Sequence, residues 1–179
     1  MSVMSITTAH YLLQAHWQVP SALRLQSAQS SWLLETDSLT ARLKSRCRQF
    51  RVQVLSEQCH PLPESLQAQL AGAEDALLRE VMLHCDAQAM IYAQSWLPVS
   101  TLAAIEPLAG LGDQPLGEFI FRHPELQRGP IEVAELDARQ LTLASSVSEP
   151  GLWARRSVFW LAEHPLQVVE VFMPEVYQL

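Results

Sequence analysis

A single glutamate interrupts an otherwise apolar stretch near the end of the chain. In PLQVVEVFMP, residues 165–174, Glu170 is the one charged side chain. The alternation of a strand places Val168 and Phe172 on the side of Glu170 and further valines on the other. Because both sides are apolar, the pattern predicts a central strand with Glu170 buried. A buried carboxylate needs a partner or a proton, which makes Glu170 the first candidate for chemistry.

Arg79 is a second charged residue in an apolar setting. The segment EDALLREVMLHCD, residues 74–86, can form a helix with an Asp75–Arg79 pair at i, i+4, or a strand with Arg79 and Val81 on one face. The short CDAQA link to the next apolar segment, QAMIYAQSWLP, favours an antiparallel hairpin. We therefore predict that Arg79 lies on a strand.

Glu170 and Arg79 allow two interpretations. They can form a structural ion pair with each other, because buried charges are usually paired. They can instead face a closed ligand cavity, where ionisable groups with perturbed pKa values gather. Composition and pattern alone favour the ion pair.

GLWARRS, which begins at Gly151, adds two arginines at the start of another predicted strand. Arg155 and Arg156 must point to opposite faces, an arrangement more typical of a solvated edge than of a ligand clamp. The tryptophans of the strand segments are expected in the core; they are Trp96, Trp153 and Trp160.

Several chemistries are disfavoured. Cys59–His60 and His84–Cys85 are adjacent pairs whose members point apart on a strand, and no C-x-x-C or H-E-x-x-H motif is present, so we expect no metal site. The six glycines form neither a G-x-G-x-x-G motif nor a P-loop, and no G-x-S-x-G elbow occurs. Three irregularly spaced cysteines do not indicate a disulfide framework, and Cys85 is expected to be a small buried apolar residue.

Composition narrows the class of protein. The chain has 179 residues, 49% of them hydrophobic and 17% charged, which suits one globular domain. A net charge of -7 argues against a general nucleic-acid binder. No signal peptide and no apolar run of about 20 residues is apparent, so we expect no membrane span and a cytoplasmic location.

The order of elements predicts the fold class. Helices are expected first, with Asp37 or Ser38 as the N-cap of a helix through Leu43, and a half-buried strand follows over residues 50–54. A short helix closed by Gly72, the hairpin, a helix capped by Ser100, and further strands after residue 130 complete the pattern. Helices followed by closely linked strands indicate an α+β fold with a mainly antiparallel sheet.

Six short motifs, in order, resemble those of the chorismate lyase family. They are WLLETDSLTARL, LLREVMLHC, LPVSTL, QPLGEFIF, GLWARRSVFWL and VEVFMP. The resemblance covers about residues 30–179, whereas residues 1–29 match only weakly. It implies a single α+β domain over residues 1–179, with flap-like loops that enclose a buried ligand.

The resemblance also implies an activity and a set of residues. Family members convert chorismate to 4-hydroxybenzoate and pyruvate at the start of ubiquinone synthesis, without a cofactor, as cytoplasmic monomers. The carboxylate-binding arginine falls on Arg79 and the catalytic glutamate on Glu170. Backbone groups that contact the ligand fall at Leu39 and Leu116.

One departure from the family concerns Gln94. The family often has arginine at this position, so the second arginine contact is in doubt, and Arg155 or Arg156 is expected to share its role. Two other functions stay open on the residues alone. One is a non-catalytic effector-binding domain of similar fold, as in some transcription regulators, and the other is a structural domain with a polar core pair.

Overall fold

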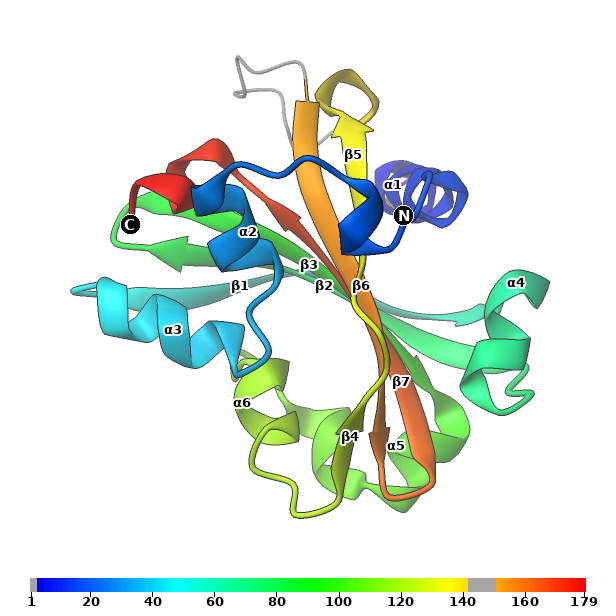
Figure 1. Ribbon diagram of the computed structural model, residues 1–179. Coiled ribbons are helices and arrows are strands. Elements are labelled where there is room, and N and C mark those ends of the chain that lie inside the picture. The colour runs from blue at the N-terminus through cyan, green and yellow to red at the C-terminus, as the bar shows by residue number, and fades with distance from the viewer. Residues whose placement is uncertain (1–2, 142–150) are drawn as a thin grey trace.

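A computed structural model describes residues 3–141 and 151–179, and in this part of the chain seven strands form one sheet (Figure 1). The order is β1-β2-β3-β7-β6-β4, with β5 also paired to β6, and every pairing is antiparallel. The strands are β1 (Phe50–Pro61), β2 (Asp75–Cys85), β3 (Gln88–Pro98), β4 (Leu126–Arg128), β5 (Glu132–Asp137), β6 (Gly151–Leu161) and β7 (His164–Phe172).

The central strands are joined in tight hairpins. Asp86 between β2 and β3, and Ala162 between β6 and β7, take positive φ angles of 55° and 54°. Such angles match the twist of two-residue hairpin turns. β7 is a central strand, and apolar clusters cover both of its faces: Val168 and Phe172 pack on one face, and Val169 and Val171 on the other, which explains its nearly continuous apolar sequence.

Helices cover both faces of the sheet unequally (Figure 1). The α-helices are α1 (Val3–Gln14), α2 (Ser27–Leu33), α3 (Leu39–Arg46), α4 (Glu64–Gln67), α5 (Val99–Ala104) and α6 (Leu116–Ile120). Short 3-10 segments are η1 (Pro20–Ala22), η2 (Ala68–Leu70), η3 (Glu106–Gly110), η4 (Ala138–Gln140) and η6 (Pro174–Gln178). Leu33 and Leu39, from α2 and α3, pack with Val81 and Phe172 on the face that carries Glu170. On the opposite face, Leu12 of α1 packs with neighbours that include Tyr92, Val169 and Val171.

The α+β class and the antiparallel sheet are confirmed, with local differences. Ser38 is the N-cap of α3, and its Oγ accepts from the Ala41 N–H at 3.2 Å. The N-cap of α5 is Pro98, so the expected cap at Ser100 is wrong. β1 continues seven residues past the expected end, through a bulge after Val54, because it pairs with the whole of β2.

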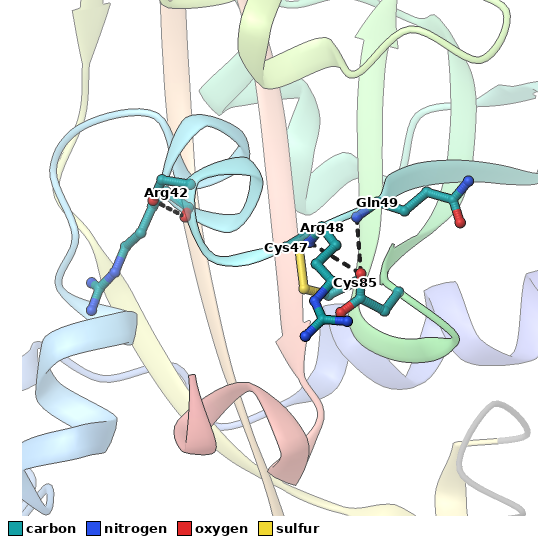
Figure 2. The surroundings of a disulfide bond; sticks show 7 residues. Arg42, Cys47, Arg48, Gln49 and Cys85 are labelled. Atoms are coloured by element: carbon teal, nitrogen blue, oxygen red, sulfur yellow. Dashed lines mark hydrogen bonds between the residues drawn. A yellow bond between two sulfur atoms is a disulfide. The ribbon is translucent and has the colours of Figure 1, made fainter.

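A disulfide joins the end of α3 to the end of β2 (Figure 2). The expectation that the cysteines stay unpaired is wrong for Cys47 and Cys85, whose Cα atoms lie 5.2 Å apart. Residues 38 apart meet because Phe50 pairs with Cys85 in the β1–β2 ladder. Asp86 reinforces the junction, since its Oδ1 accepts from the backbone N–H groups of Arg48 and Gln49. Cys59 is free and exposed.

We expect reduction of the Cys47–Cys85 bond to lower the free energy of unfolding. Closing a loop across 38 residues removes chain entropy from the unfolded state, which corresponds to about 3–4 kcal/mol. Urea unfolding with and without a dithiol reductant measures the difference, and thiol titration should find one thiol before reduction and three after. Cys59→Ser is the matched control. Equal stability in both redox states would contradict the expectation.

Candidate active site

An enclosed cavity lies between the sheet and the helices α3 and α6, which we call the roof. Its charged lining groups are Arg79 of β2, Arg155 of β6 and Glu170 of β7. Its apolar lining residues include Leu39, Val81, Leu116, Ile120, Phe159 and Val168. The open volume is about 40 Å³, far below the few hundred Å³ typical of small-molecule sites. A ring-sized ligand therefore requires the roof or the lining side chains to move outward.

The four residues singled out in the sequence all border this cavity. Leu39 and Leu116 are the first residues of α3 and α6, and Arg79 and Glu170 come from two strands of the sheet. The roof helices touch closely where α6 passes Thr40. A Cβ added at Gly117 would lie 2.9 Å from Thr40 Oγ1, so glycine permits this approach.

Glu170 pairs with Arg155. The two residues are opposite each other in the β6–β7 ladder, and Arg155 Nε donates to Glu170 Oε2 at 2.5 Å. The Glu170 side chain keeps 16% of its surface exposed, so it is less buried than its sequence suggests, whereas Arg155 keeps only 2%.

The ion pair expected between Glu170 and Arg79 is wrong. β3 lies between β2 and β7, so the two backbones are two strand spacings apart, about 10 Å. The alternative interpretation, that both face one cavity, describes their placement.

Arg79 is almost fully buried, with 2% of its side chain exposed, and is held by other groups. Its Nη2 donates to the main-chain carbonyls of Gly112 at 2.8 Å and Gln114 at 3.1 Å. Its Nη1 forms an ion pair with Glu57 on the neighbouring strand β1. The guanidinium thus fixes the segment that leads into α6.

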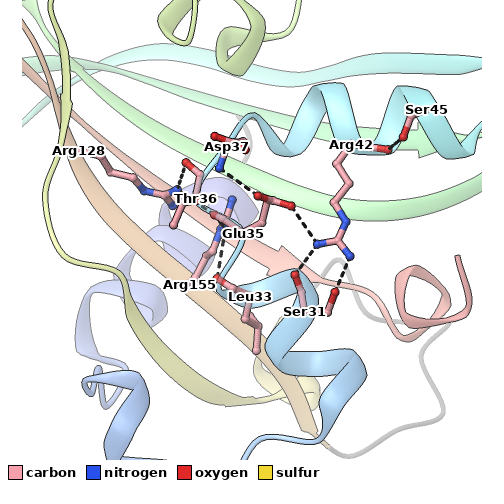
Figure 3. Close-up of polar contacts among 9 residues, drawn as sticks. All are labelled: Ser31, Leu33, Glu35, Thr36, Asp37, Arg42, Ser45, Arg128 and Arg155. Atoms are coloured by element: carbon pink, nitrogen blue, oxygen red, sulfur yellow. Dashed lines mark hydrogen bonds and ion pairs between the residues drawn. The ribbon is translucent and has the colours of Figure 1, made fainter.

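Two further arginines hold the loop between α2 and α3 in the same way (Figure 3). Arg155 Nη1 donates to the carbonyls of Leu33 at 3.2 Å and Glu35 at 2.7 Å. Arg128 of β4 donates to the Glu35 carbonyl at 3.1 Å. Burial and the nearby charge of Arg155 lower the pKa of Arg128 to about 10, so it stays cationic at neutral pH.

Arg42 completes the closure of this loop from the side of α3 (Figure 3). Its Nη2 donates to Ser31 Oγ at 2.7 Å, its Nη1 lies 3.2 Å from Glu35 Oε2, and its guanidinium stacks on Trp32 at 3.9 Å. Both segments that lead into the roof helices are therefore attached through carbonyl oxygens to arginines of the sheet, and α2 and α3 are joined to each other.

Gln94 and Arg156 lie away from the cavity. Gln94 Nε2 donates to the hydroxyl of Tyr92, on the opposite face of the sheet from Glu170, so Gln94 does not border the cavity. Arg156 pairs with Glu132 at 2.7 Å and covers Trp17. Of the two neighbouring arginines, only Arg155 faces the cavity.

Neither Arg128 nor Glu57 was among the site residues expected from the sequence. Arg128 belongs to a strand of three residues, too short to show alternation, and Glu57 lies beyond the bulge of β1 in a polar stretch. Glu57 is opposite Arg79 in the antiparallel β1–β2 ladder, and this pairing becomes visible only once the register of the two strands is known.

Comparison with known proteins gives the family. A family model described as chorismate lyase matches residues 11–179. A protein of Pseudoalteromonas translucida named "Probable chorismate pyruvate-lyase" is 44% identical, over 92% of this chain and 95% of its own. One of the same name from Thiobacillus denitrificans is 41% identical, over 90% of each chain.

Solved structures show the fold at low sequence identity. The effector domain of PhnF from Mycobacterium smegmatis aligns with a TM-score of 0.59 at 16% identity, over 79% of this chain and 91% of that one. The ligand-binding domain of a GntR-family regulator from Bordetella bronchiseptica gives 0.55 at 14%, over 71% and 84%. The likeness to these structures concerns the backbone alone. The family model and the sequence relatives match nearly the whole sequence, so the chain belongs to the chorismate lyase family of enzymes.

Proposed function

We propose that the protein converts chorismate to 4-hydroxybenzoate and pyruvate, the first step of ubiquinone synthesis, without a metal or organic cofactor. The observation that carries the proposal is the convergence of Arg79 and Glu170 on one enclosed cavity in a chain of this family. We further propose that the protein acts as a monomer.

Arg79 is the proposed partner of the ring carboxylate. Chorismate carries two carboxylates, and an enclosed site must compensate their lost hydration. A guanidinium offers two parallel N–H groups that match a carboxylate. Because the Nη2 of Arg79 already donates to two carbonyls, the carboxylate would replace neutral acceptors with a charged one.

The reaction needs little covalent chemistry from the protein. The ring C–O bond breaks and its electrons leave with the enolpyruvyl oxygen. The hydrogen on the neighbouring carbinol carbon is lost, its bonding pair completes the aromatic ring, and a proton added to the enol carbon gives pyruvate. Aromatisation supplies the driving force, so positioning and charge placement dominate catalysis.

Glu170 is the proposed group beside the carbinol. Its free carboxylate oxygen can accept a hydrogen bond from the ring hydroxyl, or carry the proton as a general base and acid. Arg155 holds the other oxygen and thereby fixes the orientation of the carboxylate. Backbone N–H groups at Leu39 and Leu116, at the first turns of the roof helices where intrahelical partners are lacking, are proposed ligand contacts.

Incubation of the purified protein with chorismate tests the function. We expect absorbance of 4-hydroxybenzoate to appear together with equimolar pyruvate, after removal of metals by a chelator. Thermal stabilisation by 4-hydroxybenzoate without turnover would point instead to a non-catalytic binding domain. If the protein shows no turnover and no stabilisation, only a structural role remains.

Glu170→Gln should mainly lower kcat, whereas Arg79→Ala should mainly weaken product binding. Loss of proton transfer should lower kcat of Glu170→Gln by about 100-fold or more with little change in product affinity. Loss of a desolvated charge partner should weaken product binding of Arg79→Ala by about 2–5 kcal/mol. Glu132→Gln and Arg139→Ala are the matched controls, and equal turnover in Glu170→Gln would limit Glu170 to orientation.

Arg155→Met should destabilise the protein far more than Arg156→Met. Removal of the Arg155 guanidinium leaves Glu170 without its partner and two loop carbonyls without a donor, at a cost of about 3–5 kcal/mol. The neighbouring Arg156 pair is more exposed, so its loss should cost about 1–2 kcal/mol. Urea unfolding of both variants measures the difference. Similar losses would mean that the Arg155 contacts add nothing specific.

A further inference from the structure

A second hollow lies on the outer side of the roof. This outer groove has a volume of about 840 Å³, and its lining includes Lys44, Arg48, Arg51, Phe119 and Arg122. It contains none of the three charged groups of the enclosed cavity. Unlike the cavity, it has room for a ring-sized ligand without any movement.

The roof helices separate the groove from the cavity. On α6, Leu116 and Ile120 border the cavity, whereas Glu118 and Phe119 border the groove. On α3, Leu39 borders the cavity, and Lys44, more than one turn later, borders the groove. Pro115, which precedes α6, borders both. The two hollows thus share α3 and α6 as a wall, and the groove is completed by Phe50 and Val52 of β1.

The groove is positive in a protein whose net charge is -7. Its lining places Lys44, Arg48 and Arg122 against the carboxylates of Asp113 and Glu118. Arg51 also borders the groove through its strand, but its side chain alternates with those of Phe50 and Val52 and lies with His84 on the other face of the sheet. Within the described residues, the guanidiniums of Arg48 and Arg51 form no ion pair. The ring of Phe50 lies 5.5 Å from Lys44 Nζ and adds an apolar surface beneath the charges. A concave site of one sign concentrates field lines and attracts counter-ions.

One exposed ion pair crosses the seam of the roof. Lys44 Nζ of α3 lies 2.7 Å from Glu118 Oε2 of α6, and both side chains are partly exposed, at 41% and 31%. The hydrogen bond from Lys44, with the charges of Lys44 and Arg122, holds the pKa of Glu118 below its usual value. An exposed pair of this kind contributes little stability, so a competing anion can separate it.

We propose that the outer groove is a docking site for a cyclic dicarboxylate, held by Arg48 and Lys44 before it passes the roof. The inference rests on the proposed function, because chorismate is the dianion concerned. The docked dianion takes Lys44 from Glu118 and so removes the ion pair that bridges α3 and α6. Docking thereby favours separation of the two roof helices, which the small cavity requires before a ligand can enter.

A binding titration tests docking without turnover. The probe is benzene-1,3-dicarboxylate, a stable cyclic dianion, followed through backbone amide NMR shifts with benzoate as the singly charged control. We expect the dianion to shift the amides of Arg48, Arg51 and Glu118, and to bind several-fold more tightly than benzoate. Shifts confined to Arg79 and Glu170, or equal affinity for the two probes, would overturn the proposal.

Two variants that break the same ion pair should change groove affinity in opposite directions. Glu118→Gln removes a competing carboxylate and should tighten dicarboxylate binding about 2–5-fold, whereas Lys44→Met removes a cation and should weaken it about equally. An ion pair with only a structural role would change both variants in the same direction. That result would overturn the part of the proposal that concerns the roof.

The kinetic consequence is a salt-dependent capture of substrate. Raising the ionic strength should lower kcat/KM for chorismate several-fold with little change in kcat. Arg48→Glu should lower kcat/KM several-fold at low salt and weaken the salt dependence. The control Arg24→Glu has the same net charge and should stay within about two-fold of the parent.

The outcomes distinguish this proposal from the proposed function. Turnover with the same salt dependence in Arg48→Glu and the parent would overturn docking and leave the lyase activity standing. Absence of turnover in every form, with dicarboxylate shifts at the groove, would refute the activity and leave docking standing. Circular dichroism and thermal melting confirm that each variant is folded.

Discussion

Three arginines with little access to water, Arg79, Arg128 and Arg155, set the main constraint on this structure. Each guanidinium must find acceptors, because an unpaired buried charge is too costly to keep. Some of these acceptors are carboxylates on neighbouring strands: Glu57 pairs with Arg79, and Glu170 pairs with Arg155. The remainder are main-chain carbonyls of the two segments that lead into α3 and α6. The guanidiniums of the sheet need hydrogen-bond acceptors, and the carbonyls that supply them hold α3 and α6 in place above the sheet.

The same contacts connect binding to closure. A ligand carboxylate at Arg79 would compete with the carbonyls that anchor the approach to α6, and Arg155 joins the carboxylate of Glu170 to the loop before α3. Ligand binding and roof position are then linked through shared donors rather than through a distant signal. An enclosed, mainly apolar space strengthens these interactions, because water no longer screens them.

The disulfide limits how the roof can move. Cys47 directly follows α3 and is bonded covalently to the sheet (Figure 2), whereas the beginning of α3 is held by hydrogen bonds and apolar packing without a covalent link. Movement of this helix is therefore easier at Leu39, beside the cavity, than at its other end. Positive charge on the outer side and the paired carboxylate on the inner side give the two surfaces of the roof different electrostatic characters.

The sequence by itself determined the class of fold and the candidate residues, because alternation, turn chemistry and charges in apolar segments are local signals. Ordered motifs identified the family for the same reason. Tertiary structure decided the partners: strand order gave Glu170 to Arg155 rather than Arg79, and strand register turned Gln94 away from the cavity. It also brought Cys47 to Cys85 and two carbonyl-lined loops to buried arginines. Such pairings depend on which distant segments become neighbours, and the local pattern of a chain does not specify that.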